Sequence, residues 1–145
     1  GWKNYVLAIH KNEMKNDSRI AAFSEDLPGH SIYQEEDFFG KGKLAAQIFI
    51  ERKLDATAVI CFNDEFAIGM IRGFQELSVK VPEQISVMGI DGTGTRKYLS
   101  PTLTTINMFP QKQGQECANI LIDMIEKTNK DIWCILNLNC SWEKV

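Results

Sequence analysis

The hydrophobic pattern of the chain is dominated by two short apolar runs that each end abruptly in polar residues. Residues 56–62 are followed at once by Asn63, and residues 85–90 are followed by Asp91. Continuous apolar runs of this length are typical of parallel strands that are buried on both faces. Ligands of such sheets bind beside the carboxyl ends of the strands, so the two runs predict a small-molecule site that includes Asn63 and Asp91.

Stretches with the period of an amphipathic helix alternate with these runs. We predict helices at residues 1–10, 43–52, 65–77 and 111–127. The third helix follows the first strand directly, and Asp64 is placed to be its N-cap. Its apolar positions, which include Ile68 and Ile71, are too numerous for one narrow stripe, so we expect part of this surface to be an interface.

Weaker patterns occupy the remaining segments. Short extended segments are predicted at residues 19–23, 103–108 and 132–142. Residues 27–37 have a turn signal and no clear period, and residues 91–99 form a Gly- and Thr-rich loop with room for one helical turn. Strands that alternate with helices predict an α/β fold with a mostly parallel sheet flanked by helices.

Composition narrows the possible functions. The 145 residues are 44% hydrophobic and 24% charged, which predicts one folded core. The net charge of −3 does not indicate the positively charged surface that binds nucleic acid. No apolar run approaches the roughly 20 residues that span a bilayer, so no membrane association is expected. The four cysteines form no C-x-x-C pair and are expected to be free thiols in a reducing cytoplasm, with Cys61 acting as a small hydrophobic residue. Because the chain opens inside a helical pattern without a cap, we expect it to be a fragment.

Two features allow a ligand interpretation beside a structural one. An aspartate followed by Gly-Thr, as in residues 91–95, occurs in phosphotransferases such as actin-like sugar kinases, but no P-loop and no second acidic cluster for magnesium accompanies it. The alternative is a flexible loop after a ligand-binding aspartate. Phe38 and Phe39 precede the second predicted helix, where an aromatic ring either stacks on a sugar or purine or anchors the loop.

The remaining reactive side chains have structural interpretations. His10 and His30 lack partners at metal-ligand spacing and are expected on the solvated surface. Lys41 and Lys43 lack the rest of a phosphate-binding loop and are expected at a solvated helix entry. We therefore predict no catalytic residue, no metal and no cofactor.

Three sequence blocks point to a known family. Residues 57–69 read TAVICFNDEFAIG, residues 81–91 read VPEQISVMGID, and residues 98–106 read YLSPTLTTI. In this order and at these separations, the blocks resemble the "TA-apolar-ND-x-x-A-x-G", "VP-x-D-ISV-x-G-x-D" and "sP-x-LTT-aliphatic" blocks of the LacI/GalR family of bacterial transcriptional regulators. The resemblance covers roughly residues 40 to 127.

The resemblance implies the carboxyl-terminal part of an effector-binding region built like a type I periplasmic binding protein, in which two α/β subdomains enclose the ligand. Residues 1–106 are then expected to form the C-terminal subdomain. Residues 107–134 would be a crossover segment and helix that pack on the absent N-terminal subdomain, and residues 135–145 a returning strand. The family's helix-turn-helix, its hinge helix and the arginine usually found just before the equivalent of Gly1-Trp2 would lie outside this chain.

The family's site residues carry over onto matching positions. The resemblance implies that Asn63 and Asp91 grip the effector and that an aromatic ring stacks on it. Spacing to Gly42 leaves Asp37 or Phe38 at the position of that ring, and chemistry favours Phe38. The implied homodimer contacts are Ile68, Ile71 and Tyr98. Gly92 stands where a second acidic residue is often seen, and the usual terminal R-x-S is not recognisable near Trp142.

The leading hypothesis is a binding module without catalysis: the effector-sensing region of a cytoplasmic, sugar-responsive regulator that binds operator DNA through a separate domain. Effector binding would change DNA binding by favouring one arrangement of the subdomains. Two alternatives are a sugar kinase-like phosphotransferase that uses Asp91 and a transport-type periplasmic sugar-binding protein of the same fold.

Overall fold

The computed structural model describes residues 5–8, 29–32, 38–126 and 141–143. The elements in chain order are β1 (Tyr5–Ala8), β2 (Gly29–Ile32), α2 (Phe38–Glu51), β3 (Ala58–Cys61), α3 (Asp64–Glu76), β4 (Ser86–Asp91), the 3-10 helix η2 (Gly94–Tyr98), β5 (Thr104–Asn107), α4 (Pro110–Glu126) and β6 (Ser141–Glu143). The strands form one sheet in the order β2-β1-β3-β4-β5-β6. Every neighbouring pair is parallel except β5 and β6, which run antiparallel, so the predicted α/β fold with a mostly parallel sheet is confirmed.

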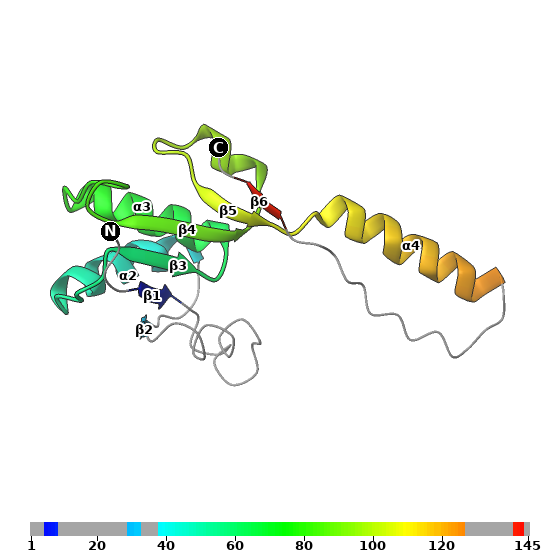
Figure 1. The fold of residues 1–145 in the computed structure, drawn as a ribbon, viewed down its shortest axis with the longest axis horizontal. Helices are drawn as coiled ribbons and strands as arrows, with labels where there is room; N and C mark the ends of the chain where they lie inside the picture. Colours follow the sequence, from blue (N-terminus) through cyan, green and yellow to red (C-terminus); the bar gives the residue numbers. More distant parts are fainter. Residues whose placement is uncertain (1–4, 9–28, 33–37, 127–140, 144–145) are drawn as a thin grey trace.

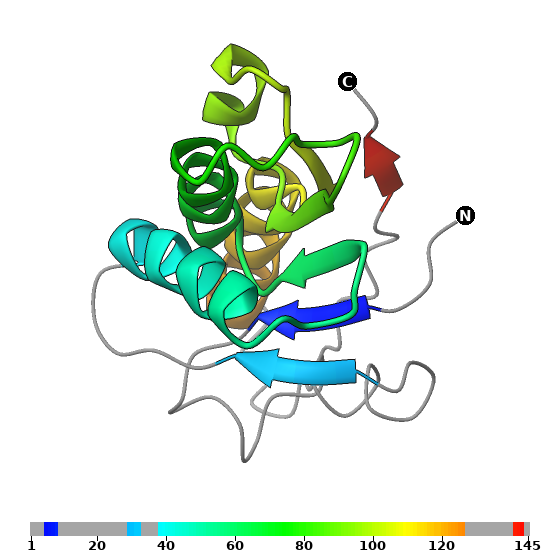
Figure 2. The same cartoon turned by 90° about the vertical axis from the view of Figure 1, so that its left-hand side faces the viewer.

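Two helices cover one face of this sheet. Helices α2 and α3 lie side by side against it, as Figure 2 shows with α2 in cyan and α3 in dark green. Helix α4 instead runs away from the sheet after β5 (Figure 1). Within the described segments, no helix combines the length and the apolar character that crossing a membrane requires.

Glycines allow α2 and α3 to touch through their backbones. A Cβ added at Gly42 would lie 2.2 Å from the carbonyl oxygen of Phe66, and one added at Gly69 would lie 2.1 Å from the carbonyl oxygen of Phe39. No side chain fits into either gap, so only glycine permits this approach. Helix α2 therefore begins at Phe38, five residues before the predicted start at residue 43. Gly42 lies inside the helix as a packing residue and does not mark its boundary.

The core lies between the two helices and the sheet. Phe49 of α2 and Phe74 of α3 meet edge to face with ring centroids 5.5 Å apart, a favourable arrangement for aromatic rings. Val59 of β3 and Leu103 are also fully buried. Burial of this surface accounts for the excess of apolar positions on α3, since Phe66, Met70 and Phe74 pack inward.

The sequence interpretation is wrong for the first two strands. Residues 5–8, predicted to lie within a helix, form β1 in the interior of the sheet, where they pair with both β2 and β3. A run of four apolar residues fits either period, and these long-range pairings decide the outcome. Residues 29–32, for which the sequence indicates a turn and no period, form β2, which lies at one end of the described sheet.

Two predicted helices and one predicted helical turn are confirmed to within a few residues, whereas other predicted segments lie partly or wholly outside the described residues. Helices α3 and α4 closely match the helices predicted at residues 65–77 and 111–127. One helical turn, η2, occurs in the predicted loop 91–99. The last predicted strand, residues 132–142, corresponds to the three-residue β6; its earlier part lies outside the described residues, as does the segment predicted at 19–23.

Candidate effector site at the carboxyl edge of the sheet

Asn63 lies where β3 ends and α3 begins. Its backbone is extended, and its Oδ1 accepts a 2.8 Å hydrogen bond from the backbone N–H of Phe66, so Asn63 is the N-cap of α3. The prediction that Asp64 caps this helix is therefore wrong. With Oδ1 engaged in the cap, the amide NH₂ of Asn63 is the group that could donate a hydrogen bond to a ligand.

Asp64 instead joins three elements inside the protein. Its carboxylate is fully buried and accepts hydrogen bonds from the backbone N–H of Thr93 at 2.7 Å, from the hydroxyl of Thr93 at 3.0 Å and from the hydroxyl of Thr105. We call Asp64, Thr93 and Thr105 the Asp64 clasp. A Cβ at Gly89 would lie 2.3 Å from Oδ1 of Asp64, so a glycine in β4 leaves room for the carboxylate. Three donors offset the cost of burying this charge.

The structure brings Asn63 and Asp91 to the same edge of the sheet. Strands β3 and β4 are parallel neighbours, and Ile60 pairs with Met88. Asn63 follows the end of β3 by two residues, and Asp91 is the last residue of β4. Both positions are partly exposed and lie at the carboxyl ends of adjacent strands, where ligands of α/β sheets bind.

Asp91 has an unusual backbone conformation. Its φ is +131° and that of Gly92 is +78°, a region that side chains other than glycine rarely adopt. The turn is held because the Asp91 carbonyl accepts from the N–H of Met108 at 3.1 Å and the N–H of Gly92 donates to the Thr105 hydroxyl at 3.3 Å. Strain of this kind costs on the order of 1–3 kcal/mol and concentrates at binding sites. The Asp64 clasp thus fixes the turn that follows the candidate ligand-binding aspartate.

The amino end of α2 carries three residues for which the sequence makes a prediction, Phe38, Lys41 and Lys43. Phe38, predicted before a helix, is the first residue of α2. Lys41, expected to be solvated, is only 4% exposed, which corrects that expectation. Lys43 is half-buried and binds Glu76 of α3, with 2.9 and 3.0 Å between its Nζ and the two carboxylate oxygens. The hydrogen bond from Lys43 lowers the pKa of Glu76, and Arg72 contributes to the same shift.

The three residues predicted at a dimer interface have different environments. Tyr98, in η2, is 89% exposed and offers a large aromatic surface. Ile68 is partly buried against the core. Ile71 is 5% exposed and belongs to the core itself, so little of its side chain remains to contact a partner. Their role in dimerisation stays a prediction.

The thiol of Cys61 lies in the core, at the end of β3. Burial, and secondarily the negative charge of Asp64, raises the pKa of the Cys61 thiol, whose Sγ lies 3.6 Å from Sδ of Met70. Cys61 is therefore an unreactive core residue, as predicted. In the part of the chain that the structure describes, no group of three or more His, Cys, Asp and Glu side chains could hold a metal ion.

Sequence reasoning missed two residues of this edge. Nothing in the order Asn63-Asp64 reveals which side chain caps α3, because the answer depends on Thr93 and Thr105, 29 and 41 residues away. The burial of Lys41 could have been suspected from its helical spacing to the apolar positions of α2, since Ala45, one turn later, faces the core.

Comparisons with known proteins agree with this architecture. The chain matches the family of periplasmic binding protein-like domains over residues 2–143. It is 32% identical over 127 residues to the HTH-type transcriptional repressor PurR of Vibrio atlanticus, covering 83% of this chain and 38% of that protein. It is 40% identical over 132 residues to PurR of Vibrio vulnificus, covering 86% of this chain and 40% of that protein. The chain thus spans about two fifths of the length of these curated relatives.

Solved structures have the same fold. A LacI family transcriptional regulator from Enterococcus faecalis with bound ribose superposes with a TM-score of 0.77 at 26% identity, over 90% of this chain and 49% of that one. The transcription regulator CcpA of Lactococcus lactis superposes with a TM-score of 0.80 at 22% identity, over 99% of this chain and 55% of that one. With its match over residues 2–143 and this fold, the chain belongs to the family of periplasmic binding protein-like domains, in the form of the LacI/GalR effector-binding region that its sequence blocks indicated.

Proposed function

We propose that this chain is the effector-sensing half of a LacI/GalR-type transcriptional regulator and that its effector is a sugar or a related metabolite. The observation that carries the proposal is that β3 and β4, whose carboxyl ends lead to Asn63 and Asp91, are adjacent parallel strands. The similarity to a regulator whose structure contains ribose supports a sugar as the class of effector.

Each side chain has a distinct role in this proposal. The Asn63 amide NH₂ donates to a hydroxyl oxygen of the effector while its carbonyl oxygen caps α3. The Asp91 carboxylate accepts hydrogen bonds from effector hydroxyls, and bonds to an ionised acceptor are the stronger kind. Phe38 stacks on the apolar face of the effector. Binding alone is needed for this role, so we propose no catalysis.

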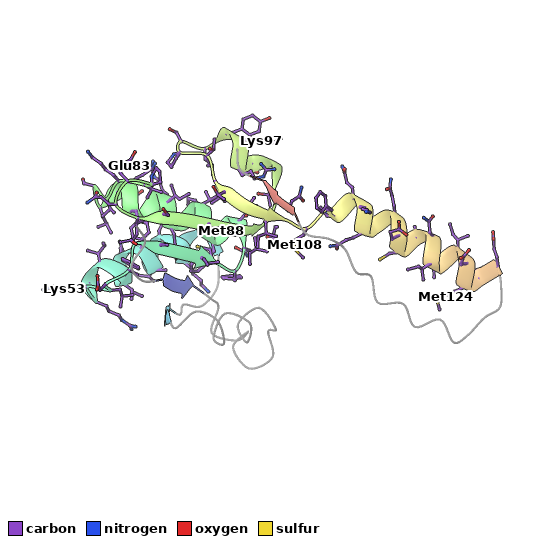
Figure 3. All side chains as sticks on the ribbon, viewed as in Figure 1. Lys53, Glu83, Met88, Lys97, Met108 and Met124 are labelled. Atoms are coloured by element: carbon purple, nitrogen blue, oxygen red, sulfur yellow. The ribbon has the colours of Figure 1, made fainter. Side chains whose placement is uncertain are left out.

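The other half of the site is proposed to come from a second subdomain. Residues 1–106 would form the C-terminal subdomain, residues 107–134 a crossover and helix, and residues 135–145 a returning strand. Exposed apolar side chains on α4, with Leu121 58% and Ile125 69% exposed, support a helix that packs on that second subdomain. Figure 3 shows the α4 side chains, Met124 among them, well away from the sheet.

We further propose that the regulator is a homodimer in the bacterial cytoplasm that binds operator DNA through a separate helix-turn-helix domain. Tyr98 and Ile68 would contribute to the dimer contact, with Ile71 supporting Ile68 from the core. Effector binding changes operator affinity only if the effector prefers one of two subdomain arrangements.

Effector binding by full-length natural protein tests the proposal. Calorimetry would compare wild type with Asn63→Ser and Asp91→Asn for a panel of pentoses, hexoses and nucleosides. Serine caps a helix about as well as asparagine, so Asn63→Ser removes the amide donor and keeps the cap. Losing a charge-assisted hydrogen bond costs about 1.5–3 kcal/mol, so we expect affinity to fall by roughly tenfold to a hundredfold in Asp91→Asn. A neutral amide–hydroxyl bond is worth about 0.5–1.5 kcal/mol, so we expect a fall of roughly twofold to tenfold in Asn63→Ser.

Glu83→Gln is a matched control because it removes an exposed charge from the turn before β4, distant from Met108 and the carboxyl edge (Figure 3). It should bind effector as wild type does. Operator DNA affinity should also change when effector is added. Wild-type affinity in both site variants, or operator binding unaffected by every compound of the panel, would count against this function.

A further inference from the structure

Lys41 is a buried cation for which the described residues provide no partner. It is 4% exposed, and among those residues its ammonium Nζ has no hydrogen-bond partner. Lys43, two positions later on the same helix, is half-buried and paired with Glu76. A buried charge without a partner is costly, and a protein retains one chiefly where something else supplies the opposite charge.

The position of Lys41 places it beside the candidate effector site. Its neighbour Gly42, near the start of α2, packs against the backbone of Phe66, near the start of α3. Further along both helices, Gly73 of α3 packs against Lys43 and Ala46 of α2. The two helices therefore run in the same direction with their amino ends together. Helix α3 begins at the carboxyl end of β3, so the first turns of both helices lie at the edge that carries Asn63.

Helix geometry directs the Lys41 side chain toward that edge. Lys41 shares a helical stripe with Ala45 and Phe49, both of which are buried in the core, so its stem lies on the inner side of α2. Side chains of a helix lean toward its amino end, so we expect the lysine stem to extend along the first turn of α2. The helix dipole at this amino end also favours negative charge.

We propose that Lys41 binds an anionic group of the effector, a phosphate or a carboxylate, at the amino end of α2. The inference rests on the proposed effector site and narrows its ligand: a sugar or related metabolite that carries a negative charge at one end. The hydroxyls of this ligand would be held by Asn63 and Asp91, and its anion would be held by the ammonium of Lys41 together with the positive end of the helix dipole.

The test compares neutral and anionic forms of one sugar on the full-length natural protein. Titration with ribose, ribose 5-phosphate, ribonate and inorganic phosphate would be made on wild type, Lys41→Met, Lys41→Arg and the control Lys43→Met. We expect an anionic form to bind wild type at least about tenfold more tightly than ribose. This preference should disappear in Lys41→Met, remain in part in Lys41→Arg and be unchanged in Lys43→Met.

The choice among the anions identifies the source of the charge. Preference for ribose 5-phosphate or for ribonate supports a phosphate or a carboxylate on the effector, respectively. Stabilisation by inorganic phosphate alone, lost in Lys41→Met, supports the anion site with the free ion as its ligand. Equal affinity for ribose and both anionic forms in wild type, with no effect of phosphate, overturns the role of Lys41 and leaves the effector site intact. If no compound binds, both proposals fail.

Thermal stability without ligand gives a second readout. Methionine matches the lysine stem and carries no charge, so removing an unpartnered buried ammonium should raise the Tm of Lys41→Met by about 2–8 °C. If an acidic residue preceding α2, such as Glu35, Glu36 or Asp37, already pairs with Lys41, the Tm falls instead. A lower Tm combined with unchanged ligand preference would assign Lys41 to an internal ion pair and overturn the proposal.

Discussion

Replacing Thr105 by valine should loosen the turn that follows Asp91. Valine has nearly the same shape and removes only the hydroxyl, which donates to the buried carboxylate of Asp64 and accepts from the N–H of Gly92. A hydrogen bond to a charged group is worth about 1.5–3 kcal/mol net. The Gly92 bond is longer, at 3.3 Å, and partly exposed, so it adds little. We therefore expect Thr105→Val to lower the free energy of unfolding by about 2–3 kcal/mol.

Urea denaturation and hydrogen exchange of the full-length protein measure this effect globally and locally. Backbone amides of residues 91–98 should exchange faster in Thr105→Val, because the Asp64 clasp no longer holds them. Thr104→Val is the matched control, since its side chain points to the opposite face of β5 and its hydroxyl makes no hydrogen bond within the described residues. That control should stay within about 0.5 kcal/mol of wild type. Equal losses in the two variants, or unchanged exchange at residues 91–98, would refute the role assigned to the clasp.

Two further predictions concern packing and thiol reactivity. Gly69→Ala places a methyl group 2.1 Å from the carbonyl oxygen of Phe39, so it should destabilise the protein by about 1–3 kcal/mol in a thermal melt, whereas Gly114→Ala in α4, with no atom within 4 Å, should be neutral or stabilising. A Gly69→Ala variant as stable as wild type would contradict the close helix contact. Mass-spectrometric mapping after brief alkylation at about pH 7.5 should find Cys117 modified and Cys61 unmodified. Cys117 is exposed, whereas Cys61 is buried and burial raises the pKa of its thiol. Rapid modification of Cys61 in folded protein would disprove this prediction.

The elements predicted best from the sequence are those whose local pattern and tertiary packing agree. Helix α3 has a clear apolar periodicity and a polar start, and its packing against α2 and the sheet follows the same residues. Strands β3 and β4 are continuous apolar runs, as expected for strands with neighbours on both sides. The position of Asn63 and Asp91 at one edge follows from these two facts alone.

What could not be predicted depends on contacts between distant segments. Four apolar residues at positions 5–8 become a strand because β2 and β3 flank them, and no local signal records that pairing. Likewise, Asp64 faces inward because Thr93, Thr105 and the gap at Gly89 receive it, leaving Asn63 to cap the helix. A glycine before an apolar stripe indicates a helix boundary, yet Gly42 serves the contact between two helices.

The backbone contact between α2 and α3 also has a mechanical consequence for the effector response that we propose. Helices separated by side chains can shear past one another through small rotamer changes, but here Gly42 and Gly69 leave no deformable layer between the two backbones. We therefore expect the two helices to move as one rigid unit, with both amino ends at the carboxyl edge of the sheet. In the regulator that we propose, an effector held at that edge would not separate the two helices, so its binding free energy would move this subdomain as a whole relative to the second one. We expect the mechanical hinge of the regulator to lie in the connections between the halves.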